Sequence, residues 1–566
     1  MSGSATLPMA GPAVAVPGRR RAAELLRLAA VLALFTLAAA VAFWPWIAHP
    51  GSALLGPPED NMQDFWNSWY AAAGRDPAHF FFTTLLRFPE GTPLVYQSFA
   101  YPQVFAVAVL SRVLGNDLHT LVALQNLTLL ASFPLAGLGA FCLVRHVAKS
   151  TAGGLAGGFV FAFNPSHVAQ AMHHAHVSQI EFLPFFALCW LLALERKSYG
   201  WLAAAVAFQV LSALSCWYYL FYCAYFIAFH LLFLRLRDRA WPRGWPLVAA
   251  AICLAATGAI LSPLLLPMVM TAAPAIYGPG ANTFVADLLA FTAFPPEHLL
   301  SRVSRALYAR LTGNAWEATV YLGIVNLAVL AWYCAHAGLR RTSPAFHVLL
   351  GILFFAVLAG GEALHVGGRA TFLHLPDVAL DKLPFFANVR TPSRAIVFAY
   401  LFLAIGIGRA AAALLAYRTT VARVAAVAVA ILVVADFWPA HLAATPVSCP
   451  PGLAVLAKDP ERGFGVLNLP LGYREDNFYL LEQACHGRPM VDGNTTREMA
   501  MTTLVYRLSF TDIARQRAQL VQARVKYVLL HRLPPDPQIP APPVAALRGA
   551  YRVVYDGPGM TVLRVY

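Results

Sequence analysis

Residues 24–47 read ELLRLAAVLALFTLAAAVAFWPWI, an almost unbroken apolar run that begins beside arginines and ends in two tryptophans. A helix needs about 20 apolar residues to cross the hydrocarbon core of a bilayer. The run is longer than the core of a signal peptide, and no clear small-residue cleavage site follows it. We therefore expect an uncleaved membrane anchor.

Ten further apolar segments predict a polytopic membrane protein. The chain of 566 residues is 59% hydrophobic and only 12% charged, with a mean hydropathy of +0.60, whereas soluble domains carry about 25% charged residues. This composition excludes a soluble enzyme and a disordered protein. With residues 24–47, the ten segments give about 11 transmembrane helices in an all-α membrane domain. They lie near 118–145, 152–166, 177–194, 200–214, 217–235, 247–271, 317–337, 346–361, 391–409 and 421–441.

The net charge of +14 predicts the orientation of these helices. Six short segments hold 17 basic and three acidic residues, and their difference equals the whole net charge. Basic residues concentrate in cytoplasmic loops, so the excess indicates a positive-inside signal rather than a nucleic-acid interface. Residues 101–114 reach about 21 Å as a helix, against a core of about 30 Å. Treating them as a partial or re-entrant helix puts all six segments on one side. These segments are 19–27, 145–149, 195–197, 235–243, 340–341 and 409–423.

The resulting topology places the N-terminus in the cytoplasm and the C-terminus outside. It predicts a cytoplasmic tail over 1–23, a membrane domain over 24–441 and a small extracytoplasmic α/β domain over 442–566. The cytoplasmic loops are short, so any chemistry should lie at the outer face or in a cavity that opens to it. The outer loops are 48–100, 272–316 and 362–390. In the last domain, 463–471 and 525–530 read as strands, 475–485 and 511–524 as helices, and 551–566 as a hairpin.

The eight cysteines show no CxxC motif and no metal-binding spacing. Only Cys449 and Cys485 lie together in the outer C-terminal segment, so they are the only plausible disulfide pair. The chain also has no glycine-rich phosphate loop with a lysine and no nucleophile elbow. ATP-driven transport and serine-hydrolase chemistry therefore have no support in the sequence.

The first outer loop carries the acidic motif EDNMQDFWNSWY over residues 59–70. Asp60 and Asp64 are four residues apart, so a helix would place them on one face. Carboxylates just above the membrane can accept the proton of a hydroxyl group or bind a divalent cation. The alternative is a solvated acidic turn that caps a helix.

A second polar group follows the apolar run near residue 162. It contains four histidines within ten residues at a span boundary, and it predicts a polar wall around a substrate cavity. The alternatives are a metal site and interfacial histidines bonded to the backbone or to lipid headgroups. Its members are His167, His173, His174, His176, Gln179 and Glu181, the last of which is expected inside the 177–194 span.

Two arginines at the outer end of the 391–409 span run against the positive-inside trend. Guanidinium groups bind phosphate oxygens with two parallel hydrogen bonds. Arg390 and Arg394 therefore predict a clamp for a lipid phosphate, and snorkelling to the headgroups is the alternative. Glu297-His298 is a further candidate of the same kind.

The order of these motifs resembles bacterial members of the GT-C glycosyltransferase superfamily, including YfhO-like proteins. The likeness extends over nearly the whole chain and includes an acidic motif in the first outer loop. The other segments that carry it are FPEG (88–91), GGLAGGFVFAFNP (153–165), HVSQ (176–179), LNLP (467–470), QACHGRP (483–489) and VKYVLLHR (525–532).

This resemblance implies a membrane glycosyltransferase at the outer face of the bacterial cytoplasmic membrane. Its partners would be a polyprenyl-phosphate-linked sugar donor and membrane lipids, and its acceptor a hydroxyl group. Asp60 or Asp64 would be the base or a metal ligand. The chain has Glu59-Asp60 and a separate Asp64 instead of Asp-x-Asp or Glu-x-Asp, which leaves a divalent cation open.

The other site residues have roles that follow from the same mechanism. Arg390 or Arg394 would stabilise the leaving phosphate, and the remaining polar residues would bind the substrate. These are Glu59, His173, His174, His176, Gln179 and Glu181. Two other functions stay open, a non-enzymatic lipid or polysaccharide translocator and an assembly partner in cell-envelope biogenesis.

Overall fold

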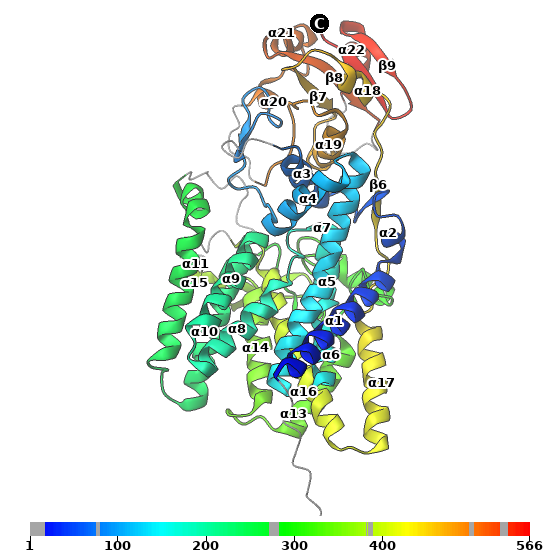
Figure 1. Cartoon of the computed structure of the whole chain (residues 1–566). Coiled ribbons are helices and arrows are strands. Elements are labelled where there is room, and N and C mark those ends of the chain that lie inside the picture. Colours follow the sequence, from blue (N-terminus) through cyan, green and yellow to red (C-terminus); the bar gives the residue numbers. More distant parts are fainter. Residues whose placement is uncertain are drawn as a thin grey trace, which may run out of the picture.

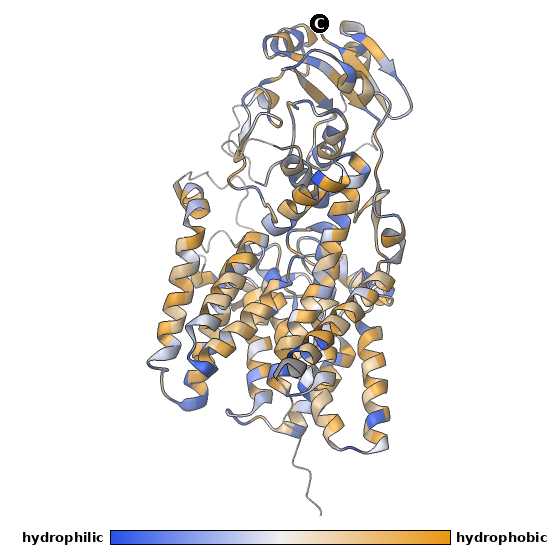
Figure 2. Ribbon diagram, viewed as in Figure 1, coloured by the Kyte–Doolittle hydropathy of each residue, from blue (hydrophilic) through white to orange (hydrophobic). Residues whose placement is uncertain are grey.

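The computed structural model describes residues 17–74, 80–270, 282–380, 382, 389–496, 503–532 and 542–566. A bundle of helices forms one part, and a smaller layer of strands and helices stands above it (Figure 1). Hydrophobic residues cover the helices of the bundle, whereas hydrophilic residues gather at its lower turns and in the upper part (Figure 2). The candidate site lies where the two parts meet.

Six helices in the described residues are long and apolar enough to cross a membrane. The expected number of about 11 crossings stays a prediction, because other bundle helices are shorter. The six are α1 (Pro17–Ala42, apolar from Arg21), α5 (Leu118–Ala148), α10 (Trp217–Asp238), α11 (Trp245–Met270), α16 (Ile396–Ala416, after the 3-10 turn η4, Pro392–Ala395) and α17 (Thr420–Phe437). The shorter apolar helices are α4 (Tyr101–Leu114), α9 (Tyr199–Ser215), α13 (Ile324–Ala337) and α14 (Pro344–Ala359).

The apolar run expected over 152–166 is interrupted in the structure. Helix α6 (Thr151–Ala162) ends before it, and a separate helix, α7 (Pro165–His173), follows. Asn164 caps α7 by accepting a hydrogen bond from the backbone N–H of His167, and Pro165 occupies the first helical position, where proline is tolerated. The break turns the chain so that α7 ends beside the first outer loop.

Two other expected spans begin later than the sequence suggests. Helix α8 (Phe182–Arg196) starts one residue after Glu181. Glu181 therefore precedes the helix, and the expectation that it lies inside a span is wrong. Helix α13 starts at Ile324 rather than near residue 317. Both shifts leave a buried acidic side chain, Glu181 or Glu317, in the segment that precedes the helix.

Two basic turns lie at the end of the bundle opposite the C-terminal segment. The α10–α11 turn contains Arg239, the α16–α17 turn contains Arg418, and both are at the bottom of Figure 1. The C-terminus is at the top of the same view. Basic turns and C-terminal segment thus occupy opposite ends of the bundle.

The upper part combines residues 48–100, the predicted first outer loop, with the C-terminal segment (Figure 1). Strands β1 (Ala53–Leu55) and β6 (Ala444–Pro446) pair antiparallel and join the two. A mixed sheet has the order β7-β8-β10-β9, in which β7 (Gly465–Leu469) and β8 (Val525–His531) are parallel. These two strands coincide with the strands predicted from sequence. The predicted hairpin is formed by β9 (Arg552–Asp556) and β10 (Met560–Arg564).

Short helices surround this sheet and the site. Helix α3 (Asp60–Ala72) carries the acidic motif, and α19 (Tyr473–His486) packs on it. The remaining elements are α2 (Trp44–Ala48), β2 (Phe82–Thr83), β3 (Thr92–Pro93), η2 (Leu288–Thr292), α12 (Ser301–Tyr308), β4 (Ala363–Val366), β5 (Arg369–His374), α15 (Asp377–Leu380), α18 (Leu453–Lys458), α20 (Leu504–Arg507), α21 (Ile513–Gln522) and α22 (Val544–Ala550).

A disulfide joins Cys449 and Cys485, whose Cα atoms are 5.7 Å apart, and this confirms the pairing predicted from the sequence. Cys485 lies in the last turn of α19, and Cys449 precedes α18. The bond therefore fixes the end of α19 to the connection between the bundle and the sheet.

Glu482 on α19 gives a pH dependence that can be measured. Burial raises the pKa of Glu482 from 4.5 to about 8. The pKa of Glu482 is therefore higher in the folded protein than in the unfolded chain. Its contribution to the free energy of unfolding is complete below pH 4.5 and is lost as pH rises toward 8. Between these pH values the wild type loses up to about 1.4 kcal/mol of its free energy of unfolding per pH unit. Glutamine cannot ionise, so we expect Glu482→Gln to abolish this loss.

Hydrogen exchange of α19 and β8 peptides in the full-length protein, compared at pH 5 and pH 7.5, measures this effect. After correction for intrinsic exchange rates, the variant should be more protected than the wild type, and by much more at pH 7.5 than at pH 5. Identical pH dependence in the two proteins would contradict the assignment.

Candidate active site

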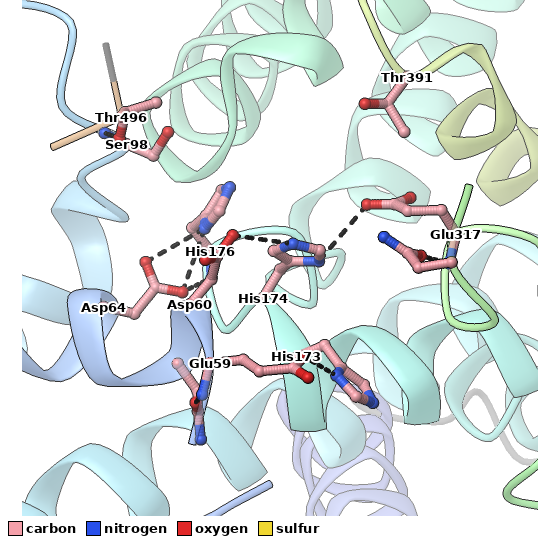
Figure 3. Close-up of polar contacts among 12 residues, drawn as sticks. Glu59, Asp60, Asp64, Ser98, His173, His174, His176, Glu317, Thr391 and Thr496 are labelled. Atoms are coloured by element: carbon pink, nitrogen blue, oxygen red, sulfur yellow. Dashed lines mark hydrogen bonds and ion pairs between the residues drawn. The ribbon is translucent and has the colours of Figure 1, made fainter. Parts of the chain in front are cut away.

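Three acidic side chains of the first outer loop each meet a histidine from the end of α7 (Figure 3). The structure thus brings together two groups that the sequence presents as separate motifs. The pairs are Glu59 Oε2 with His173 Nδ1 at 2.9 Å, Asp60 Oδ2 with His174 Nε2 at 3.2 Å, and Asp64 Oδ2 with His176 Nδ1 at 3.1 Å.

Local backbone geometry explains this pairing. Asp60 opens α3 and Asp64 follows one turn later on the same face, as their spacing predicts. Helix α7 ends at His173, and His174 has non-helical dihedral angles, φ −139° and ψ 84°. Because the helix ends there, three histidines close in sequence all face the acidic residues at the start of α3. In a continuous helix they would point in different directions.

The acidic motif is not a solvated helix cap. Glu59 occupies the N-cap position of α3, but its side chain makes no capping hydrogen bond and bonds His173 instead. Asp64 is enclosed, with 6% of its side chain exposed, and one of its oxygens also accepts the backbone N–H of His176. The Asp60 side chain is 27% exposed. Asp60 is therefore far more accessible to a substrate than Asp64.

Glu317 extends the cluster, and sequence reasoning missed it. It lies in the segment before α13, and its Oε1 is 3.4 Å from His174 Nδ1. The His174 ring therefore lies between two carboxylates, those of Asp60 and Glu317. Gln170 on α7 donates a hydrogen bond to Glu317 Oε2 at 3.1 Å. A carboxylate at the edge of an apolar run is costly in a membrane protein. Its position in the sequence could therefore have identified Glu317 as a candidate site residue.

Arg394 neutralises Glu317 in a buried ion pair. Its Nε donates to Glu317 Oε1 at 3.0 Å, and its Nη2 bonds the same carboxylate. The guanidinium carbon lies 4.8 Å from the centre of the Tyr218 ring. Burial alone would raise the pKa of Glu317, but the charges of Arg394 and His174 and the hydrogen bonds to Glu317 outweigh burial and lower it. Glu317 is thus held as a carboxylate.

The two arginines that precede α16 differ in their surroundings. Only 9% of the Arg394 side chain is exposed, so it does not snorkel into the headgroups. Two of its three nitrogens, Nε and Nη2, face Glu317. Arg390 is half-buried four residues earlier, and its predicted phosphate contact stays a prediction.

Gln179 and Glu181 are not joined to the acid–histidine pairs by a described contact. Both side chains are buried, and Gln179 Nε2 and Glu181 Oε2 have no hydrogen-bond partner among the described residues. His167 belongs to the bundle core, where it bonds the carbonyl of Ala162 at 2.6 Å and stacks on Phe133. Of the residues predicted to form a polar wall, only His173, His174 and His176 therefore contact the acidic side chains.

The divalent cation that the sequence leaves open stays a prediction. Carboxylates and imidazoles are suitable ligands, but Glu59, Asp60 and Asp64 are each engaged by a histidine ring. Within the described part of the chain, no three His, Cys, Asp or Glu side chains are arranged to hold an ion. We therefore route no chemical step through a cation.

Two solved structures share this fold. The archaeal oligosaccharyltransferase AglB from Archaeoglobus fulgidus superimposes with a TM-score of 0.52 at 12% identity, over 90% of this chain and 70% of that one. The arabinofuranosyltransferase AftD from Mycobacteria gives a TM-score of 0.57 at 13% identity, over 95% of this chain and 41% of AftD. Both are GT-C glycosyltransferases, so the chain has a GT-C-like fold. At this identity the likeness concerns the fold alone.

Sequence comparison assigns the family. The model of a domain of unknown function, DUF6311, matches residues 28–438, and the chain therefore belongs to the DUF6311 family. No curated protein matches the chain. Membership of the YfhO-like group stays a prediction.

Proposed function

We propose that this protein transfers a sugar from a polyprenyl-phosphate-linked donor to a hydroxyl acceptor at the outer face of the cytoplasmic membrane. The observation that carries the proposal is the row of acid–histidine pairs on α3 beside the buried Arg394, at the end of the bundle opposite the basic turns. The solved AglB structure contains a dolichol-phosphate and a peptide, and AftD is an arabinofuranosyltransferase. These neighbours support the choice of donor class.

Asp60 is the base in the proposed reaction. Its side chain is the more exposed of the two candidate aspartates, 27% against 6% for Asp64. As the acceptor hydroxyl attacks the anomeric carbon, Asp60 takes its proton and the bond from that carbon to the phosphate oxygen breaks. Asp64 keeps His176 in place beside the attacking group. General-base catalysis of this kind contributes about 10²–10⁴-fold to a rate.

Arg394 stabilises the lipid phosphate as it leaves. The phosphate keeps the electron pair of the broken bond, so negative charge grows on its oxygen during transfer. A positive group already oriented by Glu317 needs no reorganisation to meet that charge. In this proposal the Arg394 guanidinium supplies this contact, and Arg390 extends it. The proposal includes no divalent cation.

Lipid-linked glycan profiling of a deletion strain tests the proposal. We expect one polyprenyl-phosphate-linked sugar to accumulate in the deletion strain and one glycan to lose that sugar. Complementation with the wild-type gene should restore both, and the Asp60→Asn gene should restore neither. A translocator or an assembly partner predicts that Asp60→Asn complements fully, and this result would reject the transferase.

A further inference from the structure

The C-terminal segment packs on the helix that carries the candidate catalytic residues. Helix α19 lies directly above α3 and packs on it (Figure 1). Trp66 on α3 donates its indole N–H to Gln483 Oε1 at 2.6 Å, and Gln483 Nε2 donates to the carbonyl of Leu85 at 2.8 Å. The Cys449–Cys485 disulfide closes the far end of α19. The two helices are thus held in a fixed relation.

One side chain of α19 reaches the proposed base directly. Asn477 is fully buried, and its Nδ2 donates to Asp60 Oδ1 over 3.5 Å. Asn494 donates its own amide N–H to Asn477 Oδ1 at 3.1 Å. Because the oxygen of the Asn477 amide is occupied in this way, its NH₂ group is the end that faces Asp60.

Asp60 is therefore held at both oxygens. His174 Nε2 lies 3.2 Å from Oδ2, and Asn477 lies at Oδ1. Contacts at both oxygens restrict the orientation of the Asp60 carboxylate. A general base must lie within hydrogen-bond reach of the proton it takes, so a fixed orientation affects the chemical step more than substrate binding.

The same segment borders the site at a second place. The Ser98 backbone N–H donates to Thr496 Oγ1 at 3.0 Å, and the Thr496 N–H donates to Gln97 Oε1 at 3.1 Å. Figure 3 shows Ser98 and Thr496 on the side of His176 opposite Glu59. The C-terminal segment therefore contacts two sides of the site, through Asn477 and through Thr496.

We propose that the C-terminal segment is part of the active site and that Asn477 is a positioning residue for Asp60. This role rests on the proposed function, because it assigns Asn477 to the proton-transfer step. The sequence gives no hint of it, since 417 residues separate the two side chains.

Carbodiimide labelling of Asp60 tests the contact without any sugar substrate. Carbodiimides modify protonated carboxyl groups, so the extent of labelling against pH reports when Asp60 ionises, and peptide mass spectrometry of the full-length protein quantifies it. A second negative charge beside Asp60 disfavours its ionisation. We expect Asn477→Asp to move half-labelling upward by about one pH unit and Asn477→Leu to move it by about half a unit in the same direction.

Sugar transfer by the same variants supplies the second readout. Asn477→Leu should lower kcat about tenfold with little change in KM, because the effect lies in proton transfer rather than in binding. Glu482→Gln is the matched control, since it changes a carboxyl group on the same helix that faces His531 instead of Asp60. It should leave half-labelling of Asp60 at the wild-type pH.

If the Asn477 variants fail to fold, Asn494→Ala gives the test, because it removes only the donor that orients Asn477. It should move half-labelling upward by a smaller amount. Half-labelling at the wild-type pH in folded variants would overturn the inference, even if the wild type transfers sugar. A shift in labelling without any sugar transfer by the wild type would instead reject the proposed function and leave the contact in place.

Discussion

Asp60→Asn is expected to lower the rate of sugar transfer about 10²–10⁴-fold, because it keeps the volume of the side chain and removes the proton acceptor. The measurement is transfer from a polyprenyl-phosphate-linked donor by purified protein, with folding checked by thermal unfolding. Glu90→Gln is the control. Glu90 lies in the same outer loop and pairs with Arg507 at the surface, where Arg507 is 58% exposed. Such a change usually alters stability by less than about 0.5 kcal/mol.

Asp64→Asn separates the two candidate bases. Asp64 is enclosed and bonded twice to His176, so its replacement should loosen the histidine and reduce transfer less than Asp60→Asn does. A larger loss in Asp64→Asn would move the base to Asp64. Wild-type rates in both folded variants would show that the outer-loop carboxylates have no catalytic role.

The second large effect is expected at the buried pair of Glu317 and Arg394. Removing one member of such a pair costs about 3–5 kcal/mol, because the other charge stays buried without a partner. Glu317→Gln and Arg394→Gln should each lower the free energy of unfolding by this amount. The double variant leaves no unpaired charge, so it should recover most of the stability.

Sugar transfer by the double variant distinguishes a structural role from a functional one. If Arg394 stabilises the leaving phosphate, transfer stays low although the protein is again stable. Arg394→Lys should be intermediate, since lysine keeps the charge and loses the planar fork that contacts Glu317. Wild-type transfer by the double variant would contradict the role of Arg394 at the phosphate.

The residue types of the site could be predicted from sequence, but their pairing could not. The spacing of Asp60 and Asp64 placed them on one helix face, and the histidines stood out at the end of an apolar run. Which carboxylate meets which histidine depends on how α3 packs on the end of α7, across 112 residues of chain for Asp64 and His176. Periodicity reports local structure only, so it carries no information on that contact.

Helix boundaries account for the other differences. Apolar composition predicted a span from residue 317, whereas the helix begins at Ile324, and the residues between them form the segment that holds Glu317 at the site. Hydropathy cannot distinguish an apolar residue in a helix from one in a buried turn, because both are removed from water. The same limit put Glu181 inside a helix that begins at Phe182.

The pairing of β1 with β6 has a consequence for biosynthesis. A chain made from its N-terminus places α3 at the membrane early, but β6 follows only after the last helix of the bundle, and α19 follows β6. The match to the DUF6311 family ends at residue 438, before either element. A nascent chain of that length holds every acid–histidine pair yet lacks Asn477, so Asp60 acquires its contact with Asn477 only after the final segment has been made and β6 has paired with β1.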